Sequence, residues 1–177
     1  MDKKCVLILG GARSGKSSFA QELAKKLGDK VLFIATGEAL DEEMQSRIEQ
    51  HQKDRPKSWR TLETPSDLGP QIEKHIGDNK VVIIDCLTLL VSNLLGNESD
   101  YARAESRVTA EIDGLIACTR KVNAHFIIVS NEVGLGIVPE NKTARIYRDL
   151  LGKANQLLAQ RADEVYYMVA GIPVKIK

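Results

Sequence analysis

The chain has 177 residues, of which 43% are hydrophobic and 28% charged, so it falls among ordinary globular domains and outside disordered or fibrous chains. Lysine and arginine number 25 against 24 acidic residues, a formal charge of +1, which argues against binding nucleic acid or anionic membrane through bulk charge. We therefore expect a single domain over residues 1–177 with no nucleic-acid partner.

The cysteines and the N-terminal residues predict the compartment. Cys5, Cys86 and Cys118 form no CxxC pair, and each lies in an apolar run, so we expect buried free thiols. The apolar segment Cys5–Leu9 is too short for a signal peptide, and the longest uncharged stretch, residues 86–97, is shorter than the roughly 20 residues that span a bilayer. The sequence thus predicts a cytoplasmic protein with no membrane span.

Short apolar segments alternate with longer amphipathic ones along the chain. The apolar segments predict strands at Cys5–Leu9, Val31–Ala35, Val81–Ile84, Phe126–Val129 and Val165–Val169. The amphipathic segments predict helices at Ser17–Leu27, Asp41–Asp54, Ser66–His75, Asp100–Val122 and Lys142–Ala162, with Asp41, Ser66 and Asp100 as N-caps. Because these strands are apolar throughout, we expect an α/β fold whose mostly parallel central sheet is flanked by helices. Gly171-Ile172-Pro173, between residues 165–169 and 174–176, predicts a C-terminal antiparallel hairpin.

Residues 10–17 match the phosphate-binding pattern G-x-x-x-x-G-K-[ST], directly after an apolar strand and directly before a helical pattern. Glycines let the backbone N–H groups turn toward a phosphate, and the following helix adds its N-terminal dipole. In this pattern the lysine reaches the β and γ phosphates, and the hydroxyl that follows holds Mg²⁺. The predicted nucleotide-binding residues are Gly10, Gly11, Ala12, Arg13, Ser14, Gly15, Lys16 and Ser17, with Lys16 also catalytic and Ser17 also a metal ligand.

A second apolar strand ends in an acid, Asp85. P-loop proteins place at this point the carboxylate that organises Mg²⁺ and its water, so Asp85 is predicted to complete the metal site with Ser17. The alternative is an aspartate that caps a helix beginning at Leu87.

Further segments carry a resemblance to one family. They are Ile34-Ala35-Thr36, Asp41-Glu42-Glu43-Met44, Arg47-Ile48-x-x-His51-x-x-x-Arg55-Pro56, Trp59-Arg60-Thr61-x-Glu63, Asp85-Cys86-Leu87-Thr88, residues 130–139 and Val169-x-Gly171-Ile172-x-Val174-Lys175. Together with the P-loop, and in order over essentially the whole chain, they resemble the bifunctional adenosylcobinamide kinase/adenosylcobinamide-phosphate guanylyltransferase family of cobalamin biosynthesis.

The P-loop and the strand pattern predict an α/β P-loop fold that is RecA-like. The resemblance implies two reactions in one enzyme. The first phosphorylates the corrinoid adenosylcobinamide with ATP or GTP. The second transfers GMP from GTP to that phosphate through a guanylylated histidine, giving adenosylcobinamide-GDP and pyrophosphate. The resemblance also implies a homotrimer with sites between subunits. It implies nucleotide contacts from Ala35, Thr36, Gly37, Gln52, Lys53, Asp54, Arg55, Glu63 and Asp85.

The family motif places the guanylylated histidine on His51. On a helix over residues 41–54, His51 shares one side with Met44 and Ile48. A neutral imidazole has a nitrogen free to attack an α-phosphate near pH 7. Taken alone, a single histidine on a helix face is more often a packing or surface residue. Gln50 precedes it where many members of the family have a second histidine.

Several other polar residues keep two interpretations. Arg47, Arg55 and Arg60 suit phosphate oxygens but are also ordinary solvated charges. Glu63 accepts hydrogen bonds from a guanine edge, as the resemblance implies, or is a surface acid at the end of a strand. The 130–136 loop lies at the edge where doubly wound sheets bind ligands, or it is an ordinary turn. Trp59 and Tyr101 either face the corrinoid or pack in the core or at the surface. No catalytic role is assigned to His75 and His125.

Two other functions stay open at this level. A P-loop kinase of another small alcohol would bind the same nucleotides but would never retain labelled GMP. A RecA-like ATP-binding regulatory module would use hydrolysis as a switch and would not bind a corrinoid.

Overall fold

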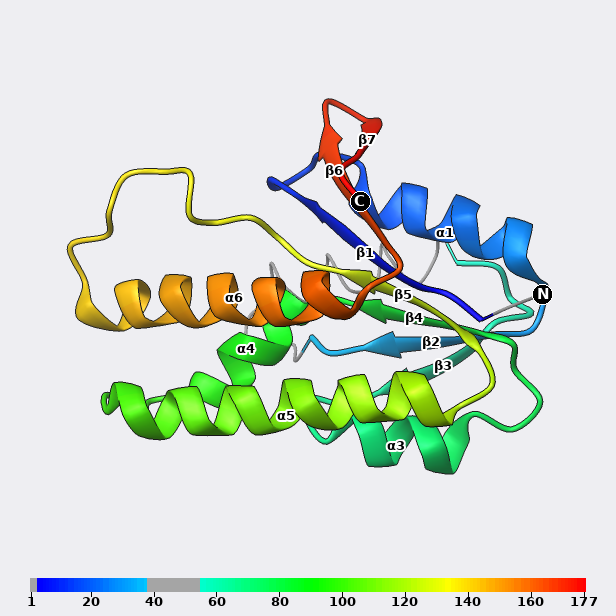
Figure 1. The fold of residues 1–177 in the computed structure, drawn as a ribbon, viewed down its shortest axis with the longest axis horizontal. Helices are drawn as coiled ribbons and strands as arrows, with labels where there is room; N and C mark the ends of the chain where they lie inside the picture. The colour runs from blue at the N-terminus through cyan, green and yellow to red at the C-terminus, as the bar shows by residue number, and fades with distance from the viewer. Residues whose placement is uncertain (1–2, 38–54) are drawn as a thin grey trace.

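The computed structural model describes residues 3–37 and 55–177. Its strands are β1 (Cys5–Gly10), β2 (Val31–Ala35), β3 (Arg60–Glu63), β4 (Val81–Asp85), β5 (His125–Val129), β6 (Glu164–Val169) and β7 (Ile172–Lys175). They form one sheet in the order β3-β2-β4-β5-β1-β6-β7 (Figure 1). All neighbouring strands are parallel except β6 and β7, which pair antiparallel, so the predicted parallel sheet and C-terminal hairpin are confirmed.

Helices cover both faces of the sheet (Figure 1). They are α1 (Lys16–Leu27), α3 (Leu68–His75), α4 (Leu87–Leu95), α5 (Tyr101–Lys121) and α6 (Lys142–Arg161). Helix α1 packs on one face through Ala20 and Ala24, while α3 to α6 pack on the other and enclose the larger part of the core. Burial on both faces is why strands such as Val31–Ala35 contain no polar residue.

Strand β3 is absent from the predicted elements, and a helix at the position of α4, beginning at Leu87, is expected only in the alternative interpretation of Asp85. Strand β3 is short and largely exposed, with only Leu62 half-buried, so it lacks the apolar signal of the other strands. Helix α4 lies in the uncharged stretch after Asp85, where a continuous apolar run hides the helical period. The predicted helix Asp41–Asp54, with its N-cap Asp41, lies outside the described residues.

The helix caps agree with the sequence at α5 and differ at α3. Asp100 caps α5 as expected, accepting hydrogen bonds from the backbone N–H groups of Ala102 and Arg103. The N-cap of α3 is Asp67 and not Ser66, and its side chain makes no capping bond. The carboxylate of Glu111 instead accepts from the N–H groups of Asp67 and Leu68, at 3.0 and 2.7 Å. Glu111 of α5 therefore caps the N-terminus of α3 in place of a residue next to that helix in the sequence.

Smaller differences concern the hairpin and the thiols. Ala170 and Gly171, both with positive φ, form a tight turn, so β7 begins at Ile172 instead of Val174. Pro173 is accepted inside β7 because this strand lies at the sheet edge.

Cys118 is buried as expected, whereas Cys5 and Cys86 are only partly buried. Among the described residues, no helix has the length and apolar composition needed to cross a bilayer.

The strand register aligns the carboxyl ends of the central strands. Ala35 of β2 lies opposite Glu63 of β3 on one side and Asp85 of β4 on the other, and Asp85 lies opposite Val129 of β5. Residues paired in parallel strands share a face of the sheet. These four positions therefore form one row at the carboxyl edge, on the face that α1 covers.

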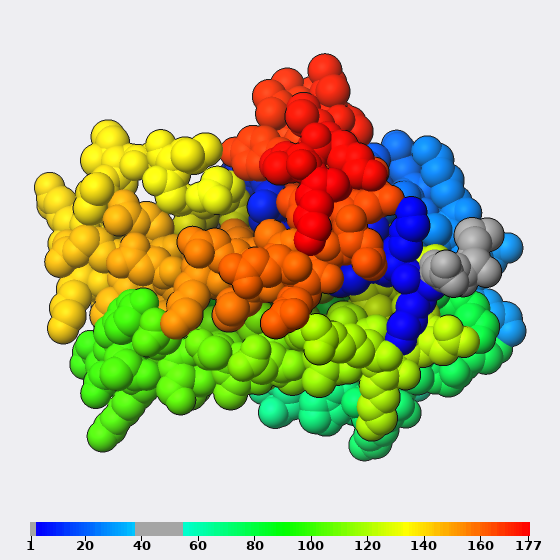
Figure 2. All heavy atoms as spheres, viewed as in Figure 1, coloured from blue at the N-terminus to red at the C-terminus, as the bar shows by residue number. Residues whose placement is uncertain are grey.

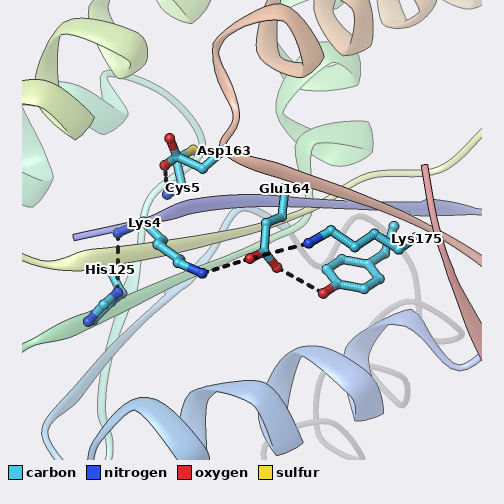
Figure 3. A network of polar contacts seen from close by, with 7 residues as sticks. Lys4, Cys5, His125, Asp163, Glu164 and Lys175 are labelled. Carbon is cyan, nitrogen blue, oxygen red and sulfur yellow. Dashed lines mark hydrogen bonds and ion pairs between the residues drawn. The ribbon is translucent and has the colours of Figure 1, made fainter. Parts of the chain in front are cut away.

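At the opposite edge, a charged network ties the N-terminal segment to the hairpin (Figure 3). Glu164 of β6 accepts hydrogen bonds from Lys4 Nζ at 2.7 Å and from the Tyr166 hydroxyl at 2.8 Å, and Lys175 Nζ lies 3.5 Å away. The bonds from Lys4 and Tyr166 lower the pKa of Glu164 from 4.5 to about 2. The carboxylate form of Glu164 is thus selectively stabilised in the folded chain.

We expect Glu164→Gln to lower the free energy of unfolding by about 1 kcal/mol near neutral pH, because the variant loses charge-assisted bonds. A lowered folded-state pKa stabilises the fold above the unfolded-state pKa, and this stabilisation is lost as the pH falls through the folded-state value. The difference between wild type and variant should therefore shrink between about pH 4.5 and pH 2. Urea unfolding at a series of pH values measures it. Glu22→Gln, on the exposed side of α1, is the control, and an equal loss there would contradict the assignment to this network.

Candidate functional site

The segment between β1 and α1 makes a tight loop, and the C-terminal hairpin packs closely against one side of it. Gly15 has φ of 94°, and a Cβ built there would lie 3.2 Å from the Cα of Gly171. A Cβ at Gly10 would lie 2.8 Å from the carbonyl oxygen of Met168. A Cβ built at Gly11 would have no atom within 4 Å. The loop is therefore packed against the hairpin on one side and open on the other.

Two segments distant in sequence hold this loop. The N–H of Gly171, in the turn between β6 and β7, donates to the carbonyl of Ser14 at 3.0 Å. The N–H of Glu132, just after β5, donates to the carbonyl of Gly10 at 3.1 Å. The hairpin and the chain after β5 therefore fix the conformation that the P-loop pattern predicts.

Lys16 begins α1 and is buried. Its Nζ donates to the carbonyl oxygen of Gly11 at 2.5 Å and lies 3.5 Å from Ser14 Oγ, so the ammonium lies over the loop. Burial lowers the pKa of Lys16, while Cys86 and Asp85 act in the opposite direction. A cation partly removed from water, above a loop of backbone N–H groups, suits an anionic ligand.

Arg55 contributes a second cation to the same face of the sheet. Its guanidinium carbon lies 3.7 Å from the centre of the Phe33 ring. Burial lowers the pKa of Arg55, with Asp85 and Glu63 acting in the opposite direction. Its Nε and Nη1 atoms are buried and have no hydrogen-bond partner among the described residues. Buried donors without partners are rare in proteins, so a ligand oxygen is the natural partner for this guanidinium.

Asp85 and Ser17 provide oxygen atoms at the same edge. Both are partly exposed, and neither side chain accepts a hydrogen bond from a residue that the structure describes. Within residues 3–37 and 55–177, no group of three or more His, Cys, Asp or Glu side chains is placed to hold a metal. One carboxylate and one hydroxyl fit Mg²⁺, which takes one or two protein oxygens and completes its shell with water and phosphate.

Thr36 links the ends of β2 and β4. Its hydroxyl donates to the carbonyl of Cys86 at 2.6 Å and accepts from the Cys86 N–H at 3.0 Å. Its own carbonyl accepts from Asn93 Nδ2 at 2.8 Å. Because the hydroxyl and carbonyl are already engaged within the fold, the role that this structure supports for Thr36 is to hold the edge that carries Asp85.

The remaining predicted positions divide into three groups. Ala35 and Glu63 end their strands in the row with Asp85, and Gly37 is the last described residue of that segment. Ala12 and Arg13 are exposed at the tip of the P-loop. The other predicted residues lie outside the described part of the chain: Arg47, Gln50, His51, Gln52, Lys53 and Asp54.

Four residues that the sequence left without a catalytic role lie in structural positions. Trp59 is buried in the core on the α1 face, and the Tyr101 hydroxyl donates to Glu105 at 3.2 Å. His75 Nδ1 lies 2.9 Å from the carbonyl of Gln71. His125, at the edge of the sheet opposite the P-loop, accepts from the Lys4 N–H at 3.2 Å (Figure 3). Arg60 donates to the carbonyl of His75 at 3.1 Å, so it supports the end of α3.

The sequence did not identify the buried polar group behind the loop after β5. Ser130, Asn155 and Thr88 are among the few buried polar residues of a mostly apolar core. The Ser130 hydroxyl donates to Asn155 Oδ1 at 2.6 Å. A signal existed in the sequence, since Asn155 interrupts the apolar side of the α6 pattern, but its partner is 25 residues away.

Comparisons with known proteins agree with this geometry. A model of the family described as cobinamide kinase/cobinamide phosphate guanyltransferase matches residues 6–176. The bifunctional adenosylcobalamin biosynthesis protein CobU of Escherichia coli K12 is 46% identical over 97% of this chain and 99% of its own length. CobU of Salmonella typhimurium is 45% identical over the same shares. CobP of Pseudomonas aeruginosa is 41% identical over 97% of this chain and 96% of its own.

Among solved structures, the RadB recombinase matches 93% of this chain and 73% of its own, with a TM-score of 0.51 and 16% identity. At that identity the likeness concerns the fold alone, and it confirms the RecA-like P-loop arrangement predicted from the strand pattern. The family match over nearly the whole chain goes further. This chain belongs to the cobinamide kinase/cobinamide phosphate guanyltransferase family, the bifunctional enzymes of cobalamin biosynthesis.

Proposed function

We propose that this enzyme phosphorylates adenosylcobinamide with ATP or GTP and then transfers GMP from GTP to the product through a histidine, His51. The observation that carries the proposal is that Lys16, Arg55 and Asp85 lie at the carboxyl edge beside the P-loop, where the charge of Asp85 acts on both cations. Such a set suits a nucleoside triphosphate with Mg²⁺. The family match favours this function over a kinase of another alcohol or a regulatory module.

In the first reaction the corrinoid hydroxyl oxygen attacks the γ-phosphorus. A new P–O bond forms, the bond to the β-phosphate bridging oxygen breaks, and the hydroxyl proton is lost. Lys16 stabilises the negative charge on the β and γ phosphates, and the N–H groups of the P-loop hold them in line. Ser17 and Asp85 would hold Mg²⁺, which supplies further charge neutralisation when bound.

In the second reaction an imidazole nitrogen of His51 attacks the α-phosphorus of GTP and pyrophosphate leaves. The phosphate oxygen of adenosylcobinamide phosphate then attacks the same phosphorus, and the P–N bond breaks to give adenosylcobinamide-GDP. Two in-line displacements replace one transfer between two anions. Arg55, with its unpartnered Nε and Nη1, is suited to bind phosphate oxygens during these displacements.

Lys16→Ala should lower both reaction rates by at least about 100-fold, because one P-loop presents the triphosphate in each and electrostatic stabilisation carries most of this catalysis. Phosphorylation is measured by transfer of label from γ-labelled GTP to the corrinoid. Guanylyl transfer is measured with α-labelled GTP. A normal rate in either reaction would show that the two reactions do not share this loop.

Asp85→Asn is the matched test of the metal assignment, since it keeps the shape and removes the charge. It should raise the Mg²⁺ concentration at which both rates reach half their maximum. An unchanged Mg²⁺ dependence with full activity would leave Asp85 as a residue before α4 with no metal-binding role.

His51→Ala should abolish covalent labelling by α-labelled GTP and guanylyl transfer, while corrinoid phosphorylation continues with the substrate's own hydroxyl. The retained label should be stable to base and labile to acid, as a phosphoramidate is. Its rate of formation should fall as the pH drops below about 6.5, the ordinary pKa of imidazole, because the protonated ring is not a nucleophile.

His75→Ala is the control, because His75 lies on α3 with its ring against the helix backbone. If labelling is retained in His51→Ala but lost in His75→Ala, the nucleophile is His75 and not His51. Loss of both reactions in His51→Ala would mean that His51 shapes the nucleotide site for each.

The assembly that we propose is a homotrimer with cyclic symmetry. Support comes from apolar side chains exposed on the segment after β5 and on the C-terminal residues 169–176: Leu135, Ile137, Val138, Val169, Ile172, Val174 and Ile176. Figure 2 shows the hairpin standing out from the body of the molecule. Exposed apolar surface of this kind is typical of interfaces.

Sedimentation equilibrium should give three times the chain mass, and Ile172→Glu should lower the measured mass of the assembly. A monomeric wild type would contradict the proposal.

A further inference from the structure

Asn131 lies between the two strands that carry the proposed nucleotide site. It follows β5, which pairs with β1 of the P-loop on one side and with β4 of Asp85 on the other. Hydrogen bonds to β1 continue beyond the end of β5, from Ser130 N–H to the Ile8 carbonyl at 2.9 Å and from Glu132 N–H to the Gly10 carbonyl at 3.1 Å. The chain therefore stays alongside β1 through Asn131.

Alternation along this extended segment assigns the Asn131 side chain to a face of the sheet. Val129 belongs to the core on the α1 face and lies opposite Asp85 in the register. Ser130 faces the other way, where its hydroxyl meets Asn155 of α6. Successive side chains of an extended chain point to opposite faces, so Asn131 returns to the face of Asp85 and of α1, which begins at Lys16.

Buried side chains hold the backbone of Asn131 from two sides. Its N–H donates to Thr88 Oγ1 of α4 at 2.9 Å, and its carbonyl accepts from Asn155 Nδ2 of α6 at 3.1 Å. Ser130 in turn orients the Asn155 amide through its hydroxyl. Networks of buried, satisfied polar groups fix a unique local structure.

The side chain of Asn131 is half-buried and makes no hydrogen bond with any residue in the described ranges. The backbone N–H and carbonyl of Asn131 are thus both hydrogen-bonded within the fold, whereas its side-chain amide has no partner among the described residues. A rigidly held amide donor between a P-loop and a metal-site carboxylate matches the requirement for a preorganised phosphate contact.

We propose that the side-chain amide of Asn131 donates a hydrogen bond to the terminal phosphate of the bound triphosphate, which makes Asn131 a catalytic residue for corrinoid phosphorylation. The inference rests on the proposed nucleotide site at the P-loop. Charge on the γ-phosphate oxygens is stabilised during transfer by donors already in position, and a neutral amide provides one without altering the net charge.

The test compares Asn131→Ala with Asn131→Asp. We expect Asn131→Ala to lower kcat for corrinoid phosphorylation about 10- to 100-fold. It should weaken binding of a non-hydrolysable GTP analogue more than binding of GDP, because GDP has no γ-phosphate. Asn131→Asp should have the larger effect on both quantities, since a carboxylate repels the phosphate. Thermal unfolding of Asn131→Ala should stay near wild type, because the backbone contacts remain.

The matched control is Asn123→Asp, an exposed asparagine before the opposite end of β5, for which we expect wild-type kinetics. Unchanged kcat and GTP-analogue affinity in Asn131→Ala would overturn the inference. So would equal losses of GTP-analogue and GDP affinity together with a lower Tm, which would indicate a structural role. If Lys16→Ala loses activity and Asn131→Ala does not, only this inference is refuted. If Lys16→Ala keeps full activity, the nucleotide site and the inference are refuted together.

Discussion

Burial of the parallel sheet on both faces is the constraint on which the rest of this structure depends. With α1 on one face and α3 to α6 on the other, the interior of each central strand accepts only apolar side chains. Polar chemistry is therefore confined to the strand ends. Because β1 to β6 all run in one direction, the carboxyl ends meet at a single edge. The P-loop, Asp85, Glu63 and Asn131 are neighbours at that edge for this reason.

At this edge the polar groups separate into those that build the site and those left for a ligand. Thr36 and the Asn155 network use their hydrogen bonds within the fold, and they fix the ends of β2 and β5. Nε and Nη1 of Arg55 and the side-chain amide of Asn131 make no hydrogen bond within the described part of the chain. Since an unpaired buried donor costs free energy, a ligand that supplies oxygen atoms gains affinity by meeting it.

The C-terminal hairpin connects this site to the rest of the molecule. Its turn bonds to the P-loop through Gly171, while Glu164 at its other end binds Lys4 beside β1. One short antiparallel unit thus supports the loop and anchors the start of the chain, and its outer side presents apolar residues to the surroundings. A partner bound to that surface would contact the residues that hold the P-loop.

The sequence by itself determined the parts of this protein that depend on local chemistry. The P-loop, the apolar strands, the Asp100 cap and Asp85 at a strand end each depend on residues close together in the chain, so their patterns are readable. The family resemblance added His51, which stays a prediction because residues 38–54 are not described. Only the tertiary structure decided that β3 pairs at an edge, that Glu111 caps α3, that Arg55 lies over Phe33 and that Asn155 holds Asn131. Each of these contacts joins residues more than 20 positions apart, and their pairing follows from how the helices and strands pack, which no local pattern encodes.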